Sequence, residues 1–401
     1  KVDDKQHEFW LSPASAKGRA FLLGIYKEIV SKYDVDGLQL DYIRYPFQTS
    51  QTRMGFEPVG REQFYRSTGA SLDGLDDYTA RLWIAWKTYQ VSSFVQQVST
   101  TLKAIKPNLK LSAAVFPMRR ETRIVTIQQD WETWIDNGWI DTLSPMSYTT
   151  DPQRLQGMFE YVQNSPKRHP LIYPGIALPR LDGGQLVEQL EAIRDKGGLG
   201  STMFAGAHLD AEKIETLANG PYKEQTCIPP HRDVVKSLQI ILADYQQKFD
   251  TLSLKGALDG LNLEQAQAIK DAMTQLNTAL GAIGQTRSLS EIPPYKVQQV
   301  QQQLKLLQAA NEVWNNSDKE QHPFRAQYFE KNILLMNELL GYLSDRVNGL
   351  GGSIAFKAPG KPPAAAMPSA NANASPVNPT EAKTAASGET STAEKPGGLS
   401  N

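Results

Sequence analysis

The fold is decided by the stretch Asp34-Val35-Asp36-Gly37-Leu38-Gln39-Leu40-Asp41-Tyr42-Ile43-Arg44-Tyr45-Pro46. Its apolar residues Val35, Leu38 and Leu40 are typical of a buried parallel strand, whose two faces are both covered. Asp41 is the first charge after this strand, so we expect it at the C-terminal end of the strand. In barrels of alternating strands and helices, catalytic groups lie at that rim. The stretch therefore predicts a parallel α/β fold with Asp41 at its functional edge.

Aromatic and basic side chains follow Asp41 directly. Tyr42, Arg44 and Tyr45 come next, and Pro46 prevents the chain from continuing into a helix. A carboxylate beside Tyr and Arg side chains is typical of a sugar-binding site. Arg44 paired with Asp41 would lower the pKa of the carboxyl group and keep it ionised. The alternatives are that Asp41 only caps its own loop and that Arg44 forms a structural ion pair.

Four further strands are expected along the chain, each separated from the next by a helical segment. They cover residues 111–116, 140–147, 171–178 and 200–205. Such alternation indicates a parallel sheet. A doubly wound sheet would usually carry a G-x-G-x-x-G turn after a strand, and this sequence has none. Residues 44–77 are polar and rich in glycine, which predicts a long functional loop over the strand ends.

Several motifs recur in the order found in one known family. Asp36-Gly37-x-x-x-Asp41-Tyr42-x-Arg44-Tyr45-Pro46 is followed by Trp86-Lys87, Phe94-Val95, Ala104-Ile105-Lys106-Pro107 and Lys110-Leu111-Ser112. Asp130-Trp131, Gly138-Trp139-Ile140-Asp141, Pro145-Met146-Ser147-Tyr148, Leu171 to Leu178 and Thr202-Met203-Phe204 come after them. Together these stretches resemble glycosyl hydrolase-like family ten, a group of bacterial envelope proteins. The resemblance covers about the first 220 residues.

The resemblance implies a fold, an activity and a location. The fold would be a (β/α)8 TIM barrel, of which this chain holds the last five or so βα units, with about three units expected before Lys1. The activity would be hydrolysis of O-glycosidic bonds in a bacterial envelope glycan, including peptidoglycan strands. The location would be periplasmic or secreted, with any export signal upstream of Lys1. Nothing in the residues themselves selects this substrate.

Glycoside hydrolysis normally needs two carboxyl groups beside the scissile bond. Asp41 is the first candidate, as nucleophile or general base, and Asp151, three residues after Tyr148, is the second. Some members of the family have a second acid where this chain has Tyr42. The second carboxylate could also lie upstream of Lys1. Weaker candidates are Glu121, Asp182, Asp210 and, in the long loop, Glu57 and Glu62.

Substrate-binding roles are expected for side chains near the strand ends. Tyr42, Arg44 and Tyr45 would orient the substrate or Asp41, and Tyr148 could hydrogen-bond a sugar hydroxyl. Trp10 precedes the first helix, near an expected loop at the same rim, and could stack on a sugar. Four of the other five tryptophans of this region lie on predicted helices or helix ends at core-like spacing, so most of the five are predicted to be structural: Trp83, Trp86, Trp131, Trp134 and Trp139.

The character of the sequence changes after Pro229-Pro230. Four segments with apolar residues at helical spacing follow, which predicts an antiparallel four-helix bundle. The stripes are expected to form a bundle core, or one of them could pair with a partner protein. The tail lacks aromatic residues and is predicted to be disordered. We therefore expect three parts: a barrel-like domain at 1–228, a bundle-like domain at 229–352 and a tail at 353–401.

Composition excludes several classes of protein. The net charge of −1 gives no electrostatic basis for binding nucleic acid. No run of about 18 apolar residues is present, which argues against a membrane span. The five histidines show no metal-binding spacing and Cys227 is alone, so neither a metal nor another cofactor is expected. The alternative to an enzyme is a non-catalytic barrel that binds glycan or acts as a scaffold, with its helical part docking a partner.

Overall fold

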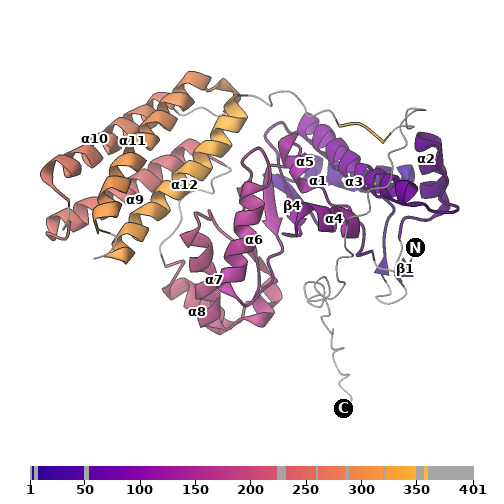
Figure 1. Cartoon of the computed structure of the whole chain (residues 1–401), viewed down its shortest axis with the longest axis horizontal. Coiled ribbons are helices and arrows are strands. Elements are labelled where there is room, and N and C mark those ends of the chain that lie inside the picture. The colour runs from indigo at the N-terminus through magenta and orange to yellow at the C-terminus, as the bar shows by residue number, and fades with distance from the viewer. Residues whose placement is uncertain are drawn as a thin grey trace, which may run out of the picture. The chain divides into compact units, whose positions relative to one another are not determined.

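The computed structural model describes residues 2–3, 8–48, 54–223, 232–258, 261–284, 289–318, 322–348 and 356–359. Pro229-Pro230, Cys227 and the tail beyond residue 359 lie outside these ranges. The predicted domain boundaries and the predicted disorder of the tail therefore stay predictions. Figure 1 colours the chain from its N-terminus to its C-terminus and labels the elements used below.

The parallel strands are neighbours in the same order as they occur in the sequence. β3 pairs with β4, β4 with β5 and β5 with β6, and β7 pairs with β8, all in parallel. Among the described parallel strands the order does not reverse, unlike in a doubly wound sheet. The parallel α/β class is confirmed, whereas closure into a barrel stays a prediction. The strands are β3 (Gly37–Leu40), β4 (Lys110–Val115), β5 (Thr142–Pro145), β6 (Leu171–Ile172), β7 (Gly175–Ala177) and β8 (Thr202–Phe204).

The strand predicted at 171–178 is divided in two. Tyr173 and Pro174 separate β6 from β7, and Pro174 has no N–H to donate to a neighbouring strand. The Tyr173 N–H still bonds the Leu143 carbonyl, and the Pro174 carbonyl accepts from Thr202 N–H. The first bond joins this segment to β5, and the second joins it to β8. The segment therefore lies between β5 and β8 in the order of the strands.

Helices connect the strands and cover the sheet. α1 begins after Ser15, whose hydroxyl accepts the Gly18 N–H at 3.1 Å, and ends at Lys32, as predicted. The helices are α1 (Ala16–Lys32), α2 (Pro58–Thr68), α3 (Asp77–Ile105), α4 (Arg120–Ile127), α5 (Trp131–Asp136), α6 (Pro152–Asn164), α7 (Gly183–Asp195) and α8 (Ala211–Asn219). Short 3-10 turns occupy Leu178–Arg180 and Gly206–His208.

Several elements were not expected from the sequence. α2 lies within the stretch predicted as a polar loop, and α4 follows β4 where only a connection was expected. A small antiparallel pair, β1 (Val2–Asp3) with β2 (Glu8–Phe9), precedes Trp10. Helix α2 was missed because its apolar side chains are few: Phe64 is fully buried, whereas Val59 and Tyr65 are exposed.

β3 is less buried than its sequence predicts. Only Leu40 is buried, Leu38 is half-buried, and Gly37 and Gln39 are exposed. In the part of the chain that the structure describes, β3 pairs with β4 on one side and with no strand on the other. Gly37 is required where β3 begins, because a Cβ there would lie 2.6 Å from the Lys110 carbonyl oxygen.

The tryptophans predicted to be structural are all buried. Trp83 and Trp86 stack at a centroid distance of 5.1 Å on α3, and Phe64 of α2 meets both rings edge-on. Trp131, Trp134 and Trp139 belong to the core between α3, α5 and the sheet. The prediction of a structural role is confirmed for these five residues.

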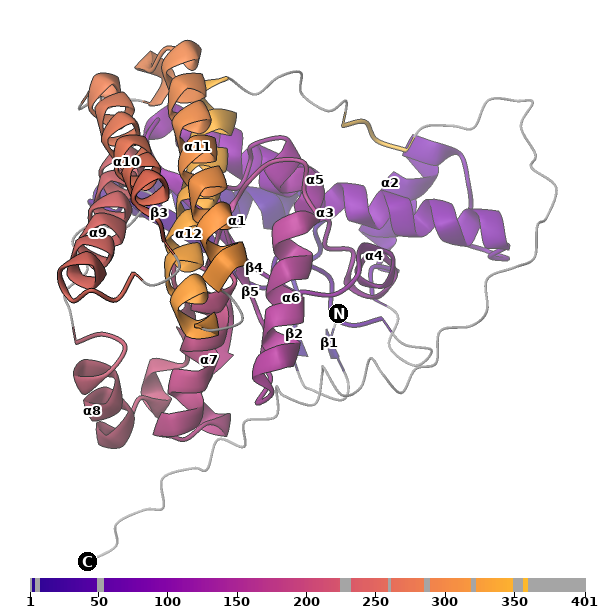
Figure 2. The same cartoon turned by 60° about the vertical axis from the view of Figure 1, so that its left-hand side comes forward.

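Four long helices form the C-terminal part. They run alongside one another in both views (Figures 1 and 2) and share one apolar core. Asn311 interrupts the apolar stripe of its helix and accepts a hydrogen bond from the Tyr245 hydroxyl at 2.9 Å. The helices are α9 (Val234–Leu254), α10 (Leu263–Ile283), α11 (Pro294–Asp318) and α12 (Pro323–Val347), after a 3-10 turn at Leu289–Glu291. No described helix is both long and apolar enough to cross a membrane.

α12 contacts the N-terminal ends of the strands. The Asp141 carboxylate, buried just before β5, pairs with Arg346 of α12 at 3.0 Å and with Lys103 of α3 at 3.1 Å. It also accepts the Leu111 N–H at 3.0 Å. This contact lies at the end of the strands opposite to Asp41, so α12 leaves the rim that carries Asp41 uncovered.

Candidate functional site

Asp41 lies directly after β3, at the C-terminal end of the strand, as predicted. Its side chain is exposed, and one oxygen accepts the N–H of Tyr42 at 2.7 Å. Asp36 lies at the other end of the same strand, where it pairs with Arg232. Asp36 and Asp41 therefore lie at opposite ends of β3, with Asp41 at the C-terminal end.

The residues after Asp41 turn sharply. Tyr42 has a φ of 51°, in the left-handed region that few residues other than glycine occupy. Its ring meets the ring of Trp10 at a centroid distance of 5.3 Å. Both rings lie beside Asp41 and form an aromatic surface, the type of surface on which sugars stack. The unusual backbone of Tyr42 is thus the local feature that brings its ring toward Trp10.

Arg44 is buried among aromatic rings. Its guanidinium lies 5.2 Å from the ring centroid of Trp10, 4.8 Å from that of Tyr42 and 5.0 Å from that of Phe116. Phe47 lies 5.6 Å away. Cation–π contacts with four rings hold the charge in one place. Pairing of Arg44 with Asp41 stays a prediction.

Tyr45 points inward and does not face the cavity of Asp41. It is 3% exposed, and burial raises the pKa of its hydroxyl well above the usual range. The ammonium of Lys87 lies 5.2 Å from the Tyr45 ring centroid, and burial lowers the pKa of Lys87 to about 8, opposed by the charge of Glu57. Tyr45 therefore belongs to a buried cluster behind the aromatic surface.

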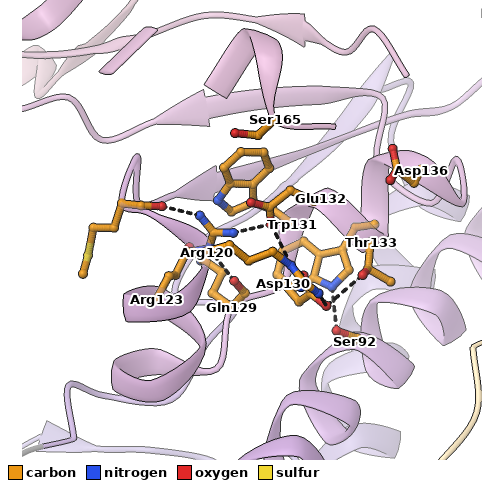
Figure 3. Close-up of polar contacts among 12 residues, drawn as sticks. Ser92, Arg120, Arg123, Gln129, Asp130, Trp131, Glu132, Thr133, Asp136 and Ser165 are labelled. Atoms are coloured by element: carbon orange, nitrogen blue, oxygen red, sulfur yellow. Dashed lines mark hydrogen bonds and ion pairs between the residues drawn. The ribbon is translucent and has the colours of Figure 1, made fainter. Parts of the chain in front are cut away.

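A network of charges holds the neighbouring rim segment, which includes α4 (Figure 3). Arg120 donates two hydrogen bonds to Asp130, at 2.9 and 2.8 Å. Arg123, fully buried, pairs with Glu132 and lies 4.3 Å from the ring centroid of Trp131. These contacts tie α4 to the start of α5.

The end of α4 in turn supports the loop after β3. The N–H groups of Tyr45 and Gln48 donate to the carbonyls of Ile127 and Thr126, at 3.0 and 2.8 Å. The loop that carries Arg44 and Tyr45 is therefore anchored to a rigid neighbour. A site on such a support keeps its geometry without a bound ligand.

A cavity of about 460 Å³ opens beside Asp41. That volume is within the range of small-molecule sites. Asp41 is the only carboxylate among the described residues that line it, and Arg19 and Arg44 are the cations. Apolar lining comes from α1 and α3 and includes Leu22, Tyr26, Val91 and Phe94, while the segment before α1 contributes Trp10, Leu11, Ser12 and Pro13.

Residues 2–169 match the family Glycosyl hydrolase-like 10. The resemblance expected from the sequence is thereby confirmed over this range, which contains Asp41 and the whole cavity. YngK of Bacillus subtilis, named a glycosyl hydrolase, is 23% identical over 156 residues, and DigH of Escherichia coli K12, also named a glycosyl hydrolase, is 25% identical over 153 residues. Each match covers 35% of this chain, but only 28% of YngK and 32% of DigH.

One solved structure is also similar. The glycoside hydrolase domain of PgaB (BpsB) from Bordetella bronchiseptica aligns with a TM-score of 0.40 and 12% sequence identity. The alignment covers 52% of this chain and 62% of that domain.

Two further predicted site residues within the Glycosyl hydrolase-like 10 match lie away from the Asp41 cavity. Asp151 caps α6, where its carboxylate accepts the N–H groups of Gln153 at 2.9 Å and Arg154 at 3.3 Å. Tyr148 stacks on Phe204 at a centroid distance of 5.6 Å. Neither lines the cavity, so the catalytic role of Asp151 and the binding role of Tyr148 stay predictions without support from this geometry.

Three of the weaker candidate acids also do not line the Asp41 cavity. Asp182 and Asp210 cap α7 and α8, and their carboxylates accept backbone N–H groups at 2.8 and 2.9 Å. Glu121 lies in the first turn of α4 and is exposed. Among the residues that the structure describes, no three His, Cys, Asp or Glu side chains are grouped so that they could hold a metal ion.

Proposed function

We propose that this protein hydrolyses O-glycosidic bonds in a bacterial cell-envelope glycan or polysaccharide, with Asp41 as a catalytic carboxylate. The observation that carries the proposal is the exposed Asp41 carboxylate in a cavity whose wall holds the Trp10 and Tyr42 rings. The family match and the names of YngK and DigH support it. Peptidoglycan strands are the first substrate to test, in a periplasmic or extracellular setting.

The geometry suits a sugar for a physical reason. One face of a pyranose ring carries C–H groups, which favour an aromatic surface, while its edge carries hydroxyl groups. Trp10 and Tyr42 supply the surface, and Asp41 can accept hydrogen bonds from hydroxyls or react near the anomeric carbon. Arg44, buried among the rings, adds positive charge to the lining of the cavity.

A non-catalytic barrel that binds glycan, with the four helices docking a partner, is the second candidate. One observation favours it: the described lining of the Asp41 cavity holds one carboxylate, whereas glycosidases normally use two. Such a protein would bind sugars through the same aromatic surface. The two candidates therefore differ in turnover rather than in binding.

The test is release of reducing ends from purified peptidoglycan glycan strands and a panel of polysaccharides. Wild type is compared with Asp41→Asn, which keeps the shape of the side chain, and with Asp34→Asn as a control. Asp34 is exposed and pairs with Lys106 at the opposite end of the strand. We expect Asp41→Asn to lose at least about a hundredfold in rate, in line with acid–base catalysis, and the control to match wild type.

Two results would contradict the proposal. Equal cleavage by wild type and Asp41→Asn would place the catalytic acids elsewhere on the rim. Binding of a glycan by wild type, measured by calorimetry, without any cleavage would favour the non-catalytic candidate.

A further inference from the structure

A second cavity adjoins the one beside Asp41. Its volume is about 260 Å³, and it shares Trp10, the segment 11–13 and Arg44 with the first cavity. The remaining lining includes Tyr45, Pro46 and Glu57. Trp10 and Arg44 thus form a common wall, with Asp41 lining one cavity and Glu57 the other.

Glu57 was one of two acids considered in the long loop, and the structure separates them. Glu62 is exposed on α2, where it pairs with Arg66 one turn along the helix. Glu57 occupies the N-cap position of α2, yet its side chain forms no capping hydrogen bond with that helix. It instead accepts a hydrogen bond from the hydroxyl of Ser12, a residue that lines both cavities. Unlike Asp151, Glu57 is therefore directed toward the cavity.

The surroundings of Glu57 are suited to a negative charge. The N-terminus of α2 carries a partial positive charge that stabilises a carboxylate. The ammonium of Lys87 is close enough for the charge of Glu57 to act on it.

Tyr45 also lines this second cavity. Its hydroxyl is buried and has no hydrogen-bond partner among the described residues. Burial and then the charge of Glu57 raise the pKa of this hydroxyl. The charge of Glu57 therefore acts on two neighbouring side chains, Tyr45 and Lys87.

We propose that the two cavities are adjacent subsites for consecutive sugar residues and that Glu57 is the second carboxylate, acting as general base. This inference rests on the proposed hydrolase function. Glu57 would take a proton from water, whose oxygen forms the new bond to the anomeric carbon. The bond from that carbon to the leaving oxygen breaks with its electron pair on the oxygen, which takes a proton from the carboxyl group of Asp41. In this step Asp41 starts protonated and Glu57 starts ionised, and transfer of the proton from Glu57 back to Asp41 through solvent restores the starting state. The reaction would invert the anomeric configuration.

The experiment uses the 401-residue chain and two probes: the glycan that wild type cleaves in the panel, and the 2,4-dinitrophenyl glycoside of its terminal sugar. Glu57→Gln should lose at least about a hundredfold in rate on both probes, because both need an activated water. Sodium azide should restore turnover of the dinitrophenyl glycoside by Glu57→Ala and yield a glycosyl azide, since azide attacks without a base. Asp41→Asn should keep the dinitrophenyl activity, because that leaving group needs no proton.

The controls separate catalysis from folding. Glu62→Gln removes an equivalent charge from the same helix and should match wild type. Glu57→Asp keeps the charge at the start of α2 but withdraws the carboxylate by one methylene. If Glu57→Gln does not fold, a Glu57→Asp variant that folds but has lost turnover still supports the catalytic role of Glu57.

Three outcomes would overturn the inference while leaving the hydrolase function intact. Unchanged turnover by Glu57→Gln would exclude Glu57 from catalysis. Equal losses in Glu57→Gln and Ser12→Ala, with no azide product from Glu57→Ala, would make Glu57 a positioning residue. A Glu57→Gln that keeps only the dinitrophenyl activity would make Glu57 the proton donor instead of the base. If wild type cleaves nothing, the hydrolase function fails first, and the Glu57 inference fails with it.

Discussion

Asp141→Asn should strongly destabilise the protein, because it leaves two cations without their partner. The Asp141 side chain is 4% exposed, and its two oxygens pair with Arg346 at 3.0 Å and Lys103 at 3.1 Å. The substitution keeps the size of the side chain and an oxygen for the Leu111 N–H. Its effect therefore reports the loss of charge and not the loss of packing.

The expected cost is about 3–5 kcal/mol, the usual range when one partner of a buried ion pair is removed. Both cations are mostly buried, with side-chain exposures of 19% for Arg346 and 27% for Lys103, so water can replace the lost partner only in part. A domain is typically stable by about 5–15 kcal/mol, which makes this a large fraction of the total.

The effect should also depend on pH. Burial alone would raise the pKa of Asp141, but Arg346 and Lys103, together with the Leu111 N–H, outweigh it and leave the pKa lowered. The stabilisation is therefore fully present above about pH 4, where the unfolded chain is ionised, and is lost as the pH falls through the lowered pKa of the folded state. The stabilities of wild type and Asp141→Asn should converge in acid.

Urea unfolding followed by circular dichroism at pH 7 and at acidic pH measures both effects. Asp73→Asn is the matched control, because Asp73 also pairs with an arginine, Arg61, but its side chain is 79% exposed. The control should unfold like wild type. If Asp141→Asn at pH 7 differs from wild type by less than about 1 kcal/mol, a value typical of surface pairs, the reasoning about buried charge is wrong.

Three further predictions concern other buried or cavity-lining groups. Burial lowers the pKa of Lys87 to about 8, so between about pH 8 and pH 10 the unfolded chain binds more protons than the folded protein. Over that range the free energy of unfolding of wild type should rise by roughly 3 kcal/mol relative to that of Lys87→Met. Parallel urea stabilities of the two proteins would contradict this. Asn311→Leu should cost about 1–3 kcal/mol, because the buried Tyr245 hydroxyl loses its acceptor, and adding Tyr245→Phe should recover most of it in thermal or urea unfolding. Trp10→Ala should weaken glycan binding by about 1 kcal/mol, or roughly fivefold in Kd by calorimetry, and an unchanged Kd would exclude stacking on this ring.

The sequence located part of the candidate site. Asp41, Tyr42, Arg44 and Trp10 were all proposed from local patterns, and the structure brings them around one cavity. Three of them follow the same strand, so the end of that strand places them together. Trp10 could be included because the helix that follows it leads directly into the strand.

The other assignments depended on contacts that local patterns do not contain. Asp151 follows a strand in the sequence, but whether its carboxylate faces a cavity or caps the next helix depends on where that helix begins. Tyr45 is three residues from Tyr42 along the turn, yet it is buried while Tyr42 is 48% exposed. Glu57 could not be ranked above Glu62 until α2 showed which of them lines a cavity.

The sequence by itself determined the class of fold, the buried tryptophans and the four C-terminal helices. These follow from apolar periodicity and from chain breaks, which act over a few residues and can be read locally. The tertiary structure alone decided the separation of Asp41 and Glu57 into neighbouring cavities, the aromatic surroundings of Arg44 and the pairing of Asp141 with Arg346. Each of these joins segments far apart in the chain, and its energy depends on burial and distance, which exist only once the chain has folded.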